Sequence, residues 1–421
     1  MNANRETSQK EYNLLRGISH QASIAMVQKI LRKGESMADV EFGEGITNYS
    51  NTFAQFSGVI PFVDYLSSRH GTSNDRVYLL DGGMQANTMV FNALGTQRPV
   101  LVDEFLYDRC LETLILLGFI VIGVPMSKDG TDTKALESLI KKYRPSCFWR
   151  NIRYNNPTGL KIKMDNVYET AEICNSNGVV HHLDDAYESC GVGLENAQDE
   201  GPVNLSHPSM KKVVLVRMTT KEFSPHEKIS WIASGPEAEI SKRITNLAVS
   251  SRLNSHYRLQ SAYYMAMLNG DYQKHISWVN KKFYRPRGVS LNKGLDEFFK
   301  EFIFNRMADA QFFTTLWLKN AGIEQGKEIV ATAANMGVKV TSGIPAIAPV
   351  DAENQPETVK QNGFVVGISP TSKHSLPVLE KMNGYPVRLS PNACPGENDP
   401  YEALKILRNA YDRVMSNPRI S

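Results

Sequence analysis

The chain has 421 residues, of which 42% are hydrophobic and 22% are charged. This length suggests two or three domains rather than one small core, and the composition is ordinary for a globular protein. The 47 basic and 44 acidic side chains leave a net charge of only +3, so charge gives no reason to expect binding to nucleic acid or to an anionic membrane surface.

Five cysteines are scattered along the chain, and none forms a CxxC pair. This pattern argues against a disulfide framework and against a zinc site, and it favours a reducing compartment. The first 17 residues lack the apolar core of a signal peptide. The sequence contains no run of about 18 apolar residues, so no membrane span is expected. We therefore expect a cytoplasmic protein that has no bound metal and no membrane partner.

Apolar side chains at helical spacing in residues 8–33 predict an amphipathic N-terminal helix or arm, and residues 58–70 predict a second helix that ends near Gly71. From residue 77, short apolar runs alternate with helical stretches such as Lys134–Lys142 and Asn166–Asn177. The runs are Val77–Leu80, Pro99–Val102, Phe119–Val124, Cys147–Asn151, Val179–Leu183, Val213–Arg217 and Ile229–Ser234. This alternation predicts an α/β fold with a mostly parallel, helix-covered sheet.

A long helical region follows over residues 236–300, and a second α/β segment covers residues 310–421. Three apolar runs in that segment predict strands: Phe312–Leu318, Val338–Val340 and Gly363–Ile368. Residues 351–361 are polar and predict a loop. We expect an N-terminal helix or arm over residues 1–45, a large domain over 46–295 and a small C-terminal domain over 296–421.

Four short polar segments lie at or beyond predicted strands, where parallel sheets place their ligands. They are residues 156–159 (NPTG), 184–187 (DDAY), 220–225 (TKEFSP) and 387–390 (VRLS). Each has an ordinary structural explanation, since NPTG is a good turn sequence and an aspartate after a strand often caps a helix. Their order is more informative: Asn156 precedes Asp184 by 28 positions, and Asp184 precedes Lys221 by 37.

These segments give the chain a resemblance to fold type I, class I/II aminotransferases that depend on pyridoxal 5′-phosphate (PLP), in the branch of aminoadipate and kynurenine aminotransferases. Residues 219–236 (TTKEFSPHEKISWIASGP) are similar to the family's SKTFAPGLRLGWIAGP, and residues 181–189 (HHLDDAYES) are similar to its EDDPYREL. The likeness runs from about residue 39 to 415. It implies a large domain around a mostly parallel sheet, a smaller α/β C-terminal domain, and a homodimer with active sites at the subunit interface.

The resemblance also implies catalytic roles. Lys221 would hold the cofactor as a Schiff base, because a side-chain amine can form one reversibly. Asp184 would keep the ring nitrogen protonated, so that the ring withdraws electrons from the substrate's α-carbon. Asn156 and Tyr187 would hydrogen-bond the 3′-oxygen of the ring, and Tyr107 would stack on the ring.

Other residues would hold the phosphate and the substrate. A loop and a helix N-terminus would bind the phosphate, with the expected contacts being Gly83, Met84, Gln85, Thr220 and Lys228. Tyr49 matches a family tyrosine that reaches the phosphate of the neighbouring subunit. Arg388, together with Asn156, would bind the substrate α-carboxylate, and no acidic residue lies near Arg388 in the sequence to pair with it.

The chain departs from the family at several positions around the predicted site. Met218 stands where a hydroxyl residue is usual, Met84 also lacks a hydroxyl, and Lys228 replaces an arginine, giving a point charge instead of a planar fork. His226 replaces a glycine and could act as an extra acid or base, although a loop histidine is usually just solvated. Residues 310–313 (AQFF) replace the family's GGYF. These departures leave the cofactor assignment intact but leave the reaction type open.

Three functions are therefore considered. The first is an aminotransferase that acts on an L-amino acid in a biosynthetic pathway. The second keeps PLP but carries out β- or γ-elimination, replacement or cyclisation, with S-adenosylmethionine as one candidate substrate. The third is a non-catalytic binding protein or regulator with the same fold. We expect no nucleic-acid partner, because about 38 residues before the matched region are too few for a winged-helix domain and no basic stripe is present.

Overall fold

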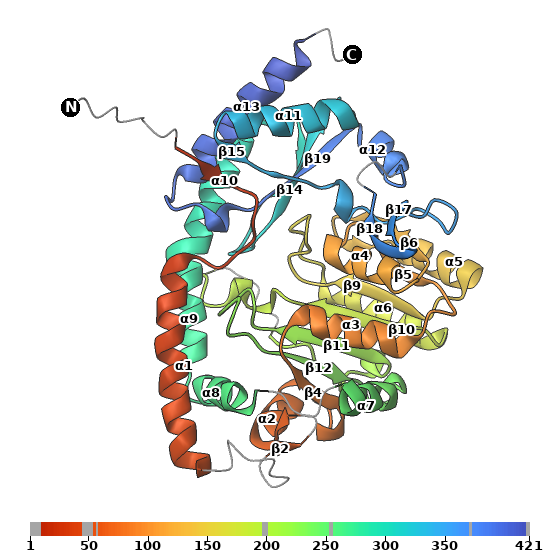
Figure 1. Ribbon diagram of the computed structural model, residues 1–421, viewed down its shortest axis with the longest axis vertical. Coiled ribbons are helices and arrows are strands. Elements are labelled where there is room, and N and C mark those ends of the chain that lie inside the picture. Colours follow the sequence, from red (N-terminus) through yellow and green to blue (C-terminus); the bar gives the residue numbers. More distant parts are fainter. Residues whose placement is uncertain are drawn as a thin grey trace, which may run out of the picture.

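A seven-stranded sheet forms the centre of the computed structural model, which describes residues 10–43, 54–55, 58–195, 201–251, 256–369 and 373–417. The strand order is β4-β12-β11-β10-β9-β5-β6 (Figure 1). The strands are β4 (Val77–Leu80), β5 (Val100–Asp103), β6 (Val121–Val124), β9 (Cys147–Asn151), β10 (Val180–Asp185), β11 (Val213–Met218) and β12 (Ser230–Ser234). Only β12 runs against its neighbours, so the predicted mostly parallel sheet is confirmed.

The strands of this sheet are buried on both faces, which explains why they appear in the sequence as nearly continuous apolar runs. On one face, Leu80 and Val216 belong to a core with residues of α3 (Gly83–Leu94) and α7 (Ile240–Ser251). On the other face, Leu79 and Leu215 belong to a core with α2 (Ile60–His70), α6 (Met164–Ser176) and α8 (Tyr257–Leu268). The sheet is therefore the middle of three layers.

One strand boundary matters for the site. The sequence predicted that β10 ends at Leu183, whereas the strand continues through Asp184 and Asp185. Successive side chains of a strand point to opposite faces. The two adjacent aspartates consequently lie on different sides of the sheet.

A four-stranded sheet with order β13-β14-β19-β16 lies beside the large one. Its strands are β13 (Ile303–Phe304), β14 (Thr314–Lys319), β16 (Thr341–Ser342) and β19 (Gly384–Leu389). The remaining helices are α1 (Gln21–Phe42), α4 (Asp108–Leu116), α5 (Thr133–Tyr143), α9 (Asp271–Val279), α10 (Arg285–Phe298), α11 (Ile323–Asn335), α12 (Leu376–Met382) and α13 (Asp399–Met415). Residues of α10, α11 and α13 form a separate core with this small sheet, and α1 runs beside α8 and α9 along one edge of the molecule (Figure 1).

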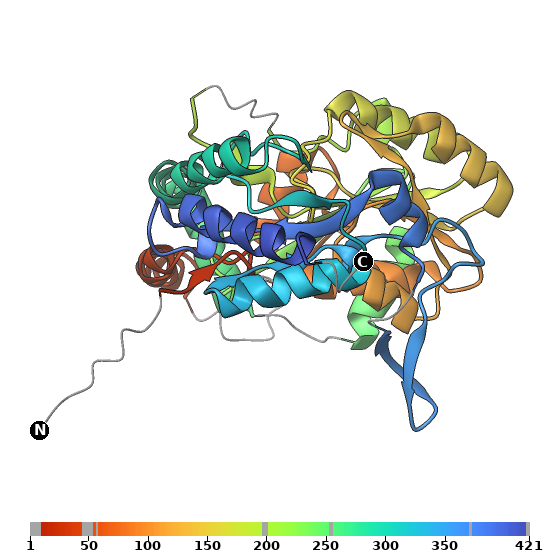
Figure 2. The ribbon, with the colours of Figure 1, turned by 90° about the horizontal axis from the view of Figure 1, so that it is seen from above.

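Short strand pairs complete the fold. They are β1 (Tyr12–Asn13) with β15 (Val338–Lys339), β2 (Ala54–Gln55) with β3 (Gly58–Val59), β7 (Met126–Ser127) with β8 (Gly130–Thr131), and β17 (Thr358–Gln361) with β18 (Phe364–Ile368). The hairpin β17–β18 projects away from the body of the molecule (Figure 2). The sequence had predicted a loop through Gln361, which is wrong for the residues of β17 because they pair with β18.

The N-terminal segment also differs from its prediction. The helix expected from residue 8 begins only at Gln21, where the His20 side chain accepts a hydrogen bond from the Ala22 amide. Before it, Leu14 donates its amide to Lys339 O at 2.9 Å and accepts from Ser390 N at 2.9 Å. The backbone of this segment is thus held by β15 and by the residue that follows β19, and the helical spacing of its apolar residues was misleading.

Candidate active site

A cavity of about 410 Å³ lies at the carboxyl ends of β9, β10 and β11, beside the N-terminus of α3. Ten of the predicted site residues line it: Gly83, Met84, Gln85, Tyr107, Asn156, Asp184, Tyr187, Thr220, Lys221 and Lys228. Arg388 lies next to it, and Tyr49 falls outside the described residues. A larger depression of about 650 Å³ lined by Arg76, Lys212 and residues of α7 contains none of them.

The Lys221 amine is held in a confined, largely apolar setting. It donates a 2.6 Å hydrogen bond to Gly17 O and lies 6.0 and 5.9 Å from the ring centroids of Phe312 and Phe313. Burial lowers the pKa of Lys221 to about 8, and the nearby charge of Arg388 acts in the same direction. A lysine with this pKa is partly neutral near physiological pH, as a nucleophilic or proton-transferring amine requires.

Asp184 faces α3 from the end of β10. Asn87 Nδ2 donates to its Oδ2 at 2.7 Å, and the Ala186 amide donates to its Oδ1 at 3.2 Å. Trp149 Nε1 lies 3.4 Å from Asn87 Oδ1, which orients the amide so that its nitrogen points to the carboxylate. Burial raises the pKa of Asp184 to about 6, against the opposing effect of the Asn87 hydrogen bond. Asn87 was not predicted from the sequence.

Behind the sheet, three arginines and three carboxylates form an ionic cluster in which all members except the partly exposed Arg69 are buried: Arg69, Arg153, Arg217, Asp185, Glu188 and Glu222. Arg217 contacts two of the carboxylates, with Glu188 at 2.9 Å and Glu222 closer still. Asp185, Glu188 and Glu222 each follow a cavity residue in the chain, namely Asp184, Tyr187 and Lys221. The cluster therefore anchors the back of the segments that carry the predicted chemistry, and sequence analysis missed it.

Two tyrosines border the cavity near Lys221. Tyr187 is buried, and its ring centroid lies 5.8 Å from that of Phe312 and 6.1 Å from that of Phe313. Tyr107 occupies the position just before α4, and its side chain makes no capping hydrogen bond there. Burial raises the pKa of Tyr187 well above its usual range and that of Tyr107 to about 12. Both phenols are consequently neutral hydrogen-bond donors near pH 7.

Arg388 reaches the site from β19 of the small sheet. Its Nη1 donates to Asn156 Oδ1 at 3.1 Å, and its guanidinium carbon lies 5.0 Å from the ring centroid of Phe313. Asp108 Oδ1 lies 3.8 Å from Nη1. No acidic residue lies near Arg388 in the sequence, but folding brings Asp108, at the start of α4, close to it.

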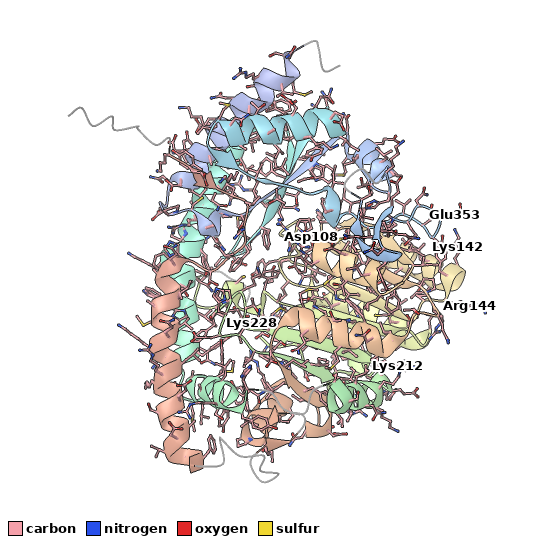
Figure 3. The ribbon with its side chains drawn as sticks, in the orientation of Figure 1. Asp108, Lys142, Arg144, Lys212, Lys228 and Glu353 are labelled. Atoms are coloured by element: carbon pink, nitrogen blue, oxygen red, sulfur yellow. The ribbon has the colours of Figure 1, made fainter. Side chains whose placement is uncertain are left out.

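The end of the cavity at α3 is the predicted phosphate position. A Cβ at Gly83 would lie 2.1 Å from Met218 Sδ, so the Met218 side chain packs directly against this glycine. The Gly82 amide donates to Ser230 Oγ at 3.1 Å, which places a hydroxyl near the position where Met218 supplies none. Lys228 borders the same glycines near the centre of the molecule (Figure 3), its Cε lying 3.1 Å from where a Cβ of Gly82 would be. Lys228 and the first turn of α3, whose amides have no partner within the helix, thus lie at one end of the cavity, an arrangement suited to an anion.

The structure also shows the surroundings of His226 and of the cysteines. His226 is exposed and does not line the cavity, which gives no support to an acid–base role. All five cysteines are free and buried. Across the described ranges, no cluster of three or more His, Cys, Asp or Glu side chains is arranged to hold a metal ion. In the same part of the chain, no helix is long and apolar enough to cross a membrane.

Comparison with known proteins bears on this arrangement. Residues 19–284 match the family model of aminotransferase class I and II. The chain belongs to this aminotransferase family. The 2-aminoadipate transaminase of Thermus thermophilus is 26% identical over 206 residues, which are 47% of this chain and 49% of that protein. An uncharacterized HTH-type transcriptional regulator of Bacillus subtilis is 22% identical over 221 residues, 52% of this chain and 44% of that one. The chain thus spans about half the length of each of these two curated relatives.

Solved structures extend the likeness to nearly the whole chain. The α-aminoadipate aminotransferase of Thermus thermophilus, complexed with N-(5′-phosphopyridoxyl)-L-leucine, has a TM-score of 0.73 at 18% identity and covers 96% of this chain and 93% of its own. The kynurenine aminotransferase of Pyrococcus horikoshii has a TM-score of 0.77 at 18% identity, with coverages of 98% and 93%. The predicted fold of class I/II aminotransferases is thereby confirmed.

Proposed function

We propose that this member of the aminotransferase family is a PLP-dependent aminotransferase that acts on an L-amino acid. The observation that carries the proposal is the cavity in which Lys221 and Asp184 lie together with an anion-binding helix N-terminus. This combination offers an amine, a buried carboxylate and a phosphate cradle in one enclosed space.

The donor set fits PLP. Lys221 would hold the cofactor covalently, Asp184 would face its ring nitrogen, and Gly83 with Lys228 would hold its phosphate. The 410 Å³ volume lies within the usual range for small-molecule sites. When bound, PLP supplies an electron sink that weakens the bonds at the substrate's α-carbon.

The protein's own groups would bind the substrate and move its protons. Arg388 presents a buried Nε that has no hydrogen-bond partner among the described residues, so a substrate carboxylate can complete its bonding. Lys221 Nζ, with its pKa lowered to about 8, would take the α-proton and return it at another carbon. The rings of Phe312 and Phe313 would keep water away from that nitrogen.

We also propose a cellular location, a metabolic role, domain boundaries and an oligomeric state for this protein. The cytoplasmic location, the biosynthetic role and the domain boundaries are proposed as expected from the sequence. Exposed apolar side chains on the N-terminal segment and α1, namely Ile18 (43%), Met26 (41%) and Val40 (88%), support a homodimer that covers them. The role of Tyr49 at a partner's phosphate rests on the resemblance alone.

A spectroscopic half-reaction tests the proposed function. PLP-loaded protein is mixed with single amino acids, and the cofactor absorbance and released products are measured. An aminotransferase converts the cofactor to its amino form, releases one equivalent of 2-oxo acid, and returns to the start when a second 2-oxo acid is added. Continuous release of ammonia without that second acid would favour the elimination alternative. Absence of any turnover would favour the regulator alternative, which the similarity to the Bacillus subtilis protein keeps in view.

A further inference from the structure

Asp108 is a carboxylate that the proposed reaction does not use. It occupies the first position of α4, directly after Tyr107, where the elements of the large and small sheets meet (Figure 3). Its side chain is 28% exposed, yet its Oδ1 atom is buried and has no hydrogen-bond partner among the residues the structure describes. A buried oxygen of this kind is costly unless a ligand or another group supplies a donor.

The nearest cation does not fill this need. Asp108 Oδ1 lies 3.8 Å from Arg388 Nη1, which is too long for a hydrogen bond. Arg388 Nη1 instead donates to Asn156 Oδ1, and Arg388 Nε is also buried without a partner in the described part of the chain. The two charges therefore face each other, and each keeps bonding capacity for a third group.

Substrate binding changes the balance of charge at this place. A carboxylate that binds Arg388 brings a second negative charge close to Asp108. Like charges at short distance in a partly buried site repel strongly. A cation on the same substrate would relieve the repulsion and give Asp108 Oδ1 the donor that it lacks.

The aromatic side chains nearby suit the aliphatic chain that would join the carboxylate and the cation of such a substrate. Phe313 lies 5.0 Å from the Arg388 guanidinium, and Phe312 packs beside Tyr187. Aromatic faces accommodate aliphatic stems and also attract cations. By contrast, the cations of the described cavity lining are Lys221 and Lys228. Both, like Arg388 beside the cavity, already have proposed roles, so none of them is left to receive a second substrate carboxylate.

We propose that Asp108 selects amino acids whose side chain carries a positive charge, such as an ammonium or a guanidinium group, and selects against those with a second carboxylate. This inference rests on the proposed function, because it assumes that Arg388 binds the substrate carboxylate. It differs from what the name of the 2-aminoadipate relative would suggest.

An ordinary structural role for Asp108 makes a different prediction. A carboxylate in the first turn of a helix stabilises that helix through the helix dipole. Its loss would then lower thermal stability and would weaken all ligands equally. A change in the preference between ligands distinguishes recognition from this structural effect.

The test measures binding by calorimetry to the PLP-loaded protein and requires no turnover. Three unreactive carboxylates share a six-carbon acid chain: 6-guanidinohexanoate, hexanoate and adipate. The wild-type protein should bind 6-guanidinohexanoate about tenfold or more tightly than hexanoate, and adipate most weakly. Asp108→Asn should bring the guanidinium and methyl compounds within about threefold of each other and strengthen adipate binding.

The matched control is Glu112→Gln, which removes the same charge one turn further along α4, where Glu112 pairs with Arg109. It should leave the ligand order unchanged. Equal binding of 6-guanidinohexanoate and hexanoate by the wild-type protein would overturn the proposal even if Asp108→Asn failed to fold. An equal change for all three ligands in Asp108→Asn would also overturn it. Because the proposed function is judged by amino-acid turnover, its failure would be recognised separately.

Discussion

The amine of Lys221 donates a 2.6 Å hydrogen bond to the carbonyl oxygen of Gly17. A second contact, from Ser19 Oγ to Lys221 O at 3.2 Å, ties the same segments together. A Cβ at Gly17 would lie 2.1 Å from Phe313 Cζ, so only glycine allows the backbone to approach both the lysine and that ring. The segment before α1 is thus part of the wall of the site.

Gly17→Ala should impair activity without abolishing cofactor binding. The added methyl group displaces Phe313 or the backbone, and a shift of about 1 Å near the reacting nitrogen lowers kcat/KM by about a hundredfold. Steady-state kinetics and the cofactor spectrum measure the two effects. Gly288→Ala is the control, since a Cβ there meets no atom nearer than 3.6 Å. Wild-type kinetics in Gly17→Ala would show that the contact has no role.

The contribution of Asp184 to the stability of the cofactor-free protein should fall as pH rises. Its pKa is raised from 3.8 to about 6 by burial, so the folded state holds the proton more tightly than the unfolded chain does. The stabilising contribution is complete below pH 3.8 and is lost as pH rises through 6. Relative to wild type, Asp184→Asn should therefore gain roughly 2 kcal/mol between pH 4 and pH 7. Urea unfolding at both pH values measures this, and a constant difference would contradict it.

Two buried histidines should make the protein sensitive to acid. His181 stacks on Phe148 and His182 lies between Phe91 and Trp149, and the described residues supply no hydrogen bond to either ring. Burial lowers the pKa of His182 to about 3 and that of His181 well below its usual range. The unfolded chain takes up protons near pH 6.5 and the folded chain does not, so stability falls below that pH.

The size of this effect follows from the pKa difference. Each histidine should remove about 2 kcal/mol of stability between pH 8 and pH 5. His182→Phe should remove its share of the loss, as measured by urea unfolding at the two pH values. His226→Gln, in an exposed loop, serves as the control and should behave as wild type. If His182→Phe lost as much stability between pH 8 and pH 5 as the wild-type protein, the proposed role of His182 would be wrong.

The ionic cluster behind the sheet should be needed for folding. Arg217→Met leaves the buried Glu188 and Glu222 without their shared partner, which should lower the free energy of unfolding by about 3–5 kcal/mol. Arg306→Met breaks an exposed pair with Asp296 and should lower it by less than about 1 kcal/mol. Similar values for the two variants, from urea unfolding, would mean that the cluster is not a major support.

The sequence predicted the large sheet well because each of its strands is buried on both faces and appears as a short apolar run. It also pointed to Asn156, Asp184 and Lys221, and the structure brings these three residues together in one cavity. Gly17, Asn87 and Asp108 were missed, since each reaches the site from another element and only tertiary contacts reveal it. The spacing of Leu14 and its apolar neighbours was misread because an extended segment can carry the same short pattern as a helix.

Lys221 is the lysine proposed to hold PLP. The most direct measurement is borohydride reduction of the PLP-loaded protein, followed by proteolysis and mass spectrometry of the peptides. The phosphopyridoxyl group should be found on the peptide containing Lys221 and should be lost in Lys221→Ala, which should still fold. Recovery of the group on Lys228 or on another lysine, with Lys221 unmodified, would contradict this proposal.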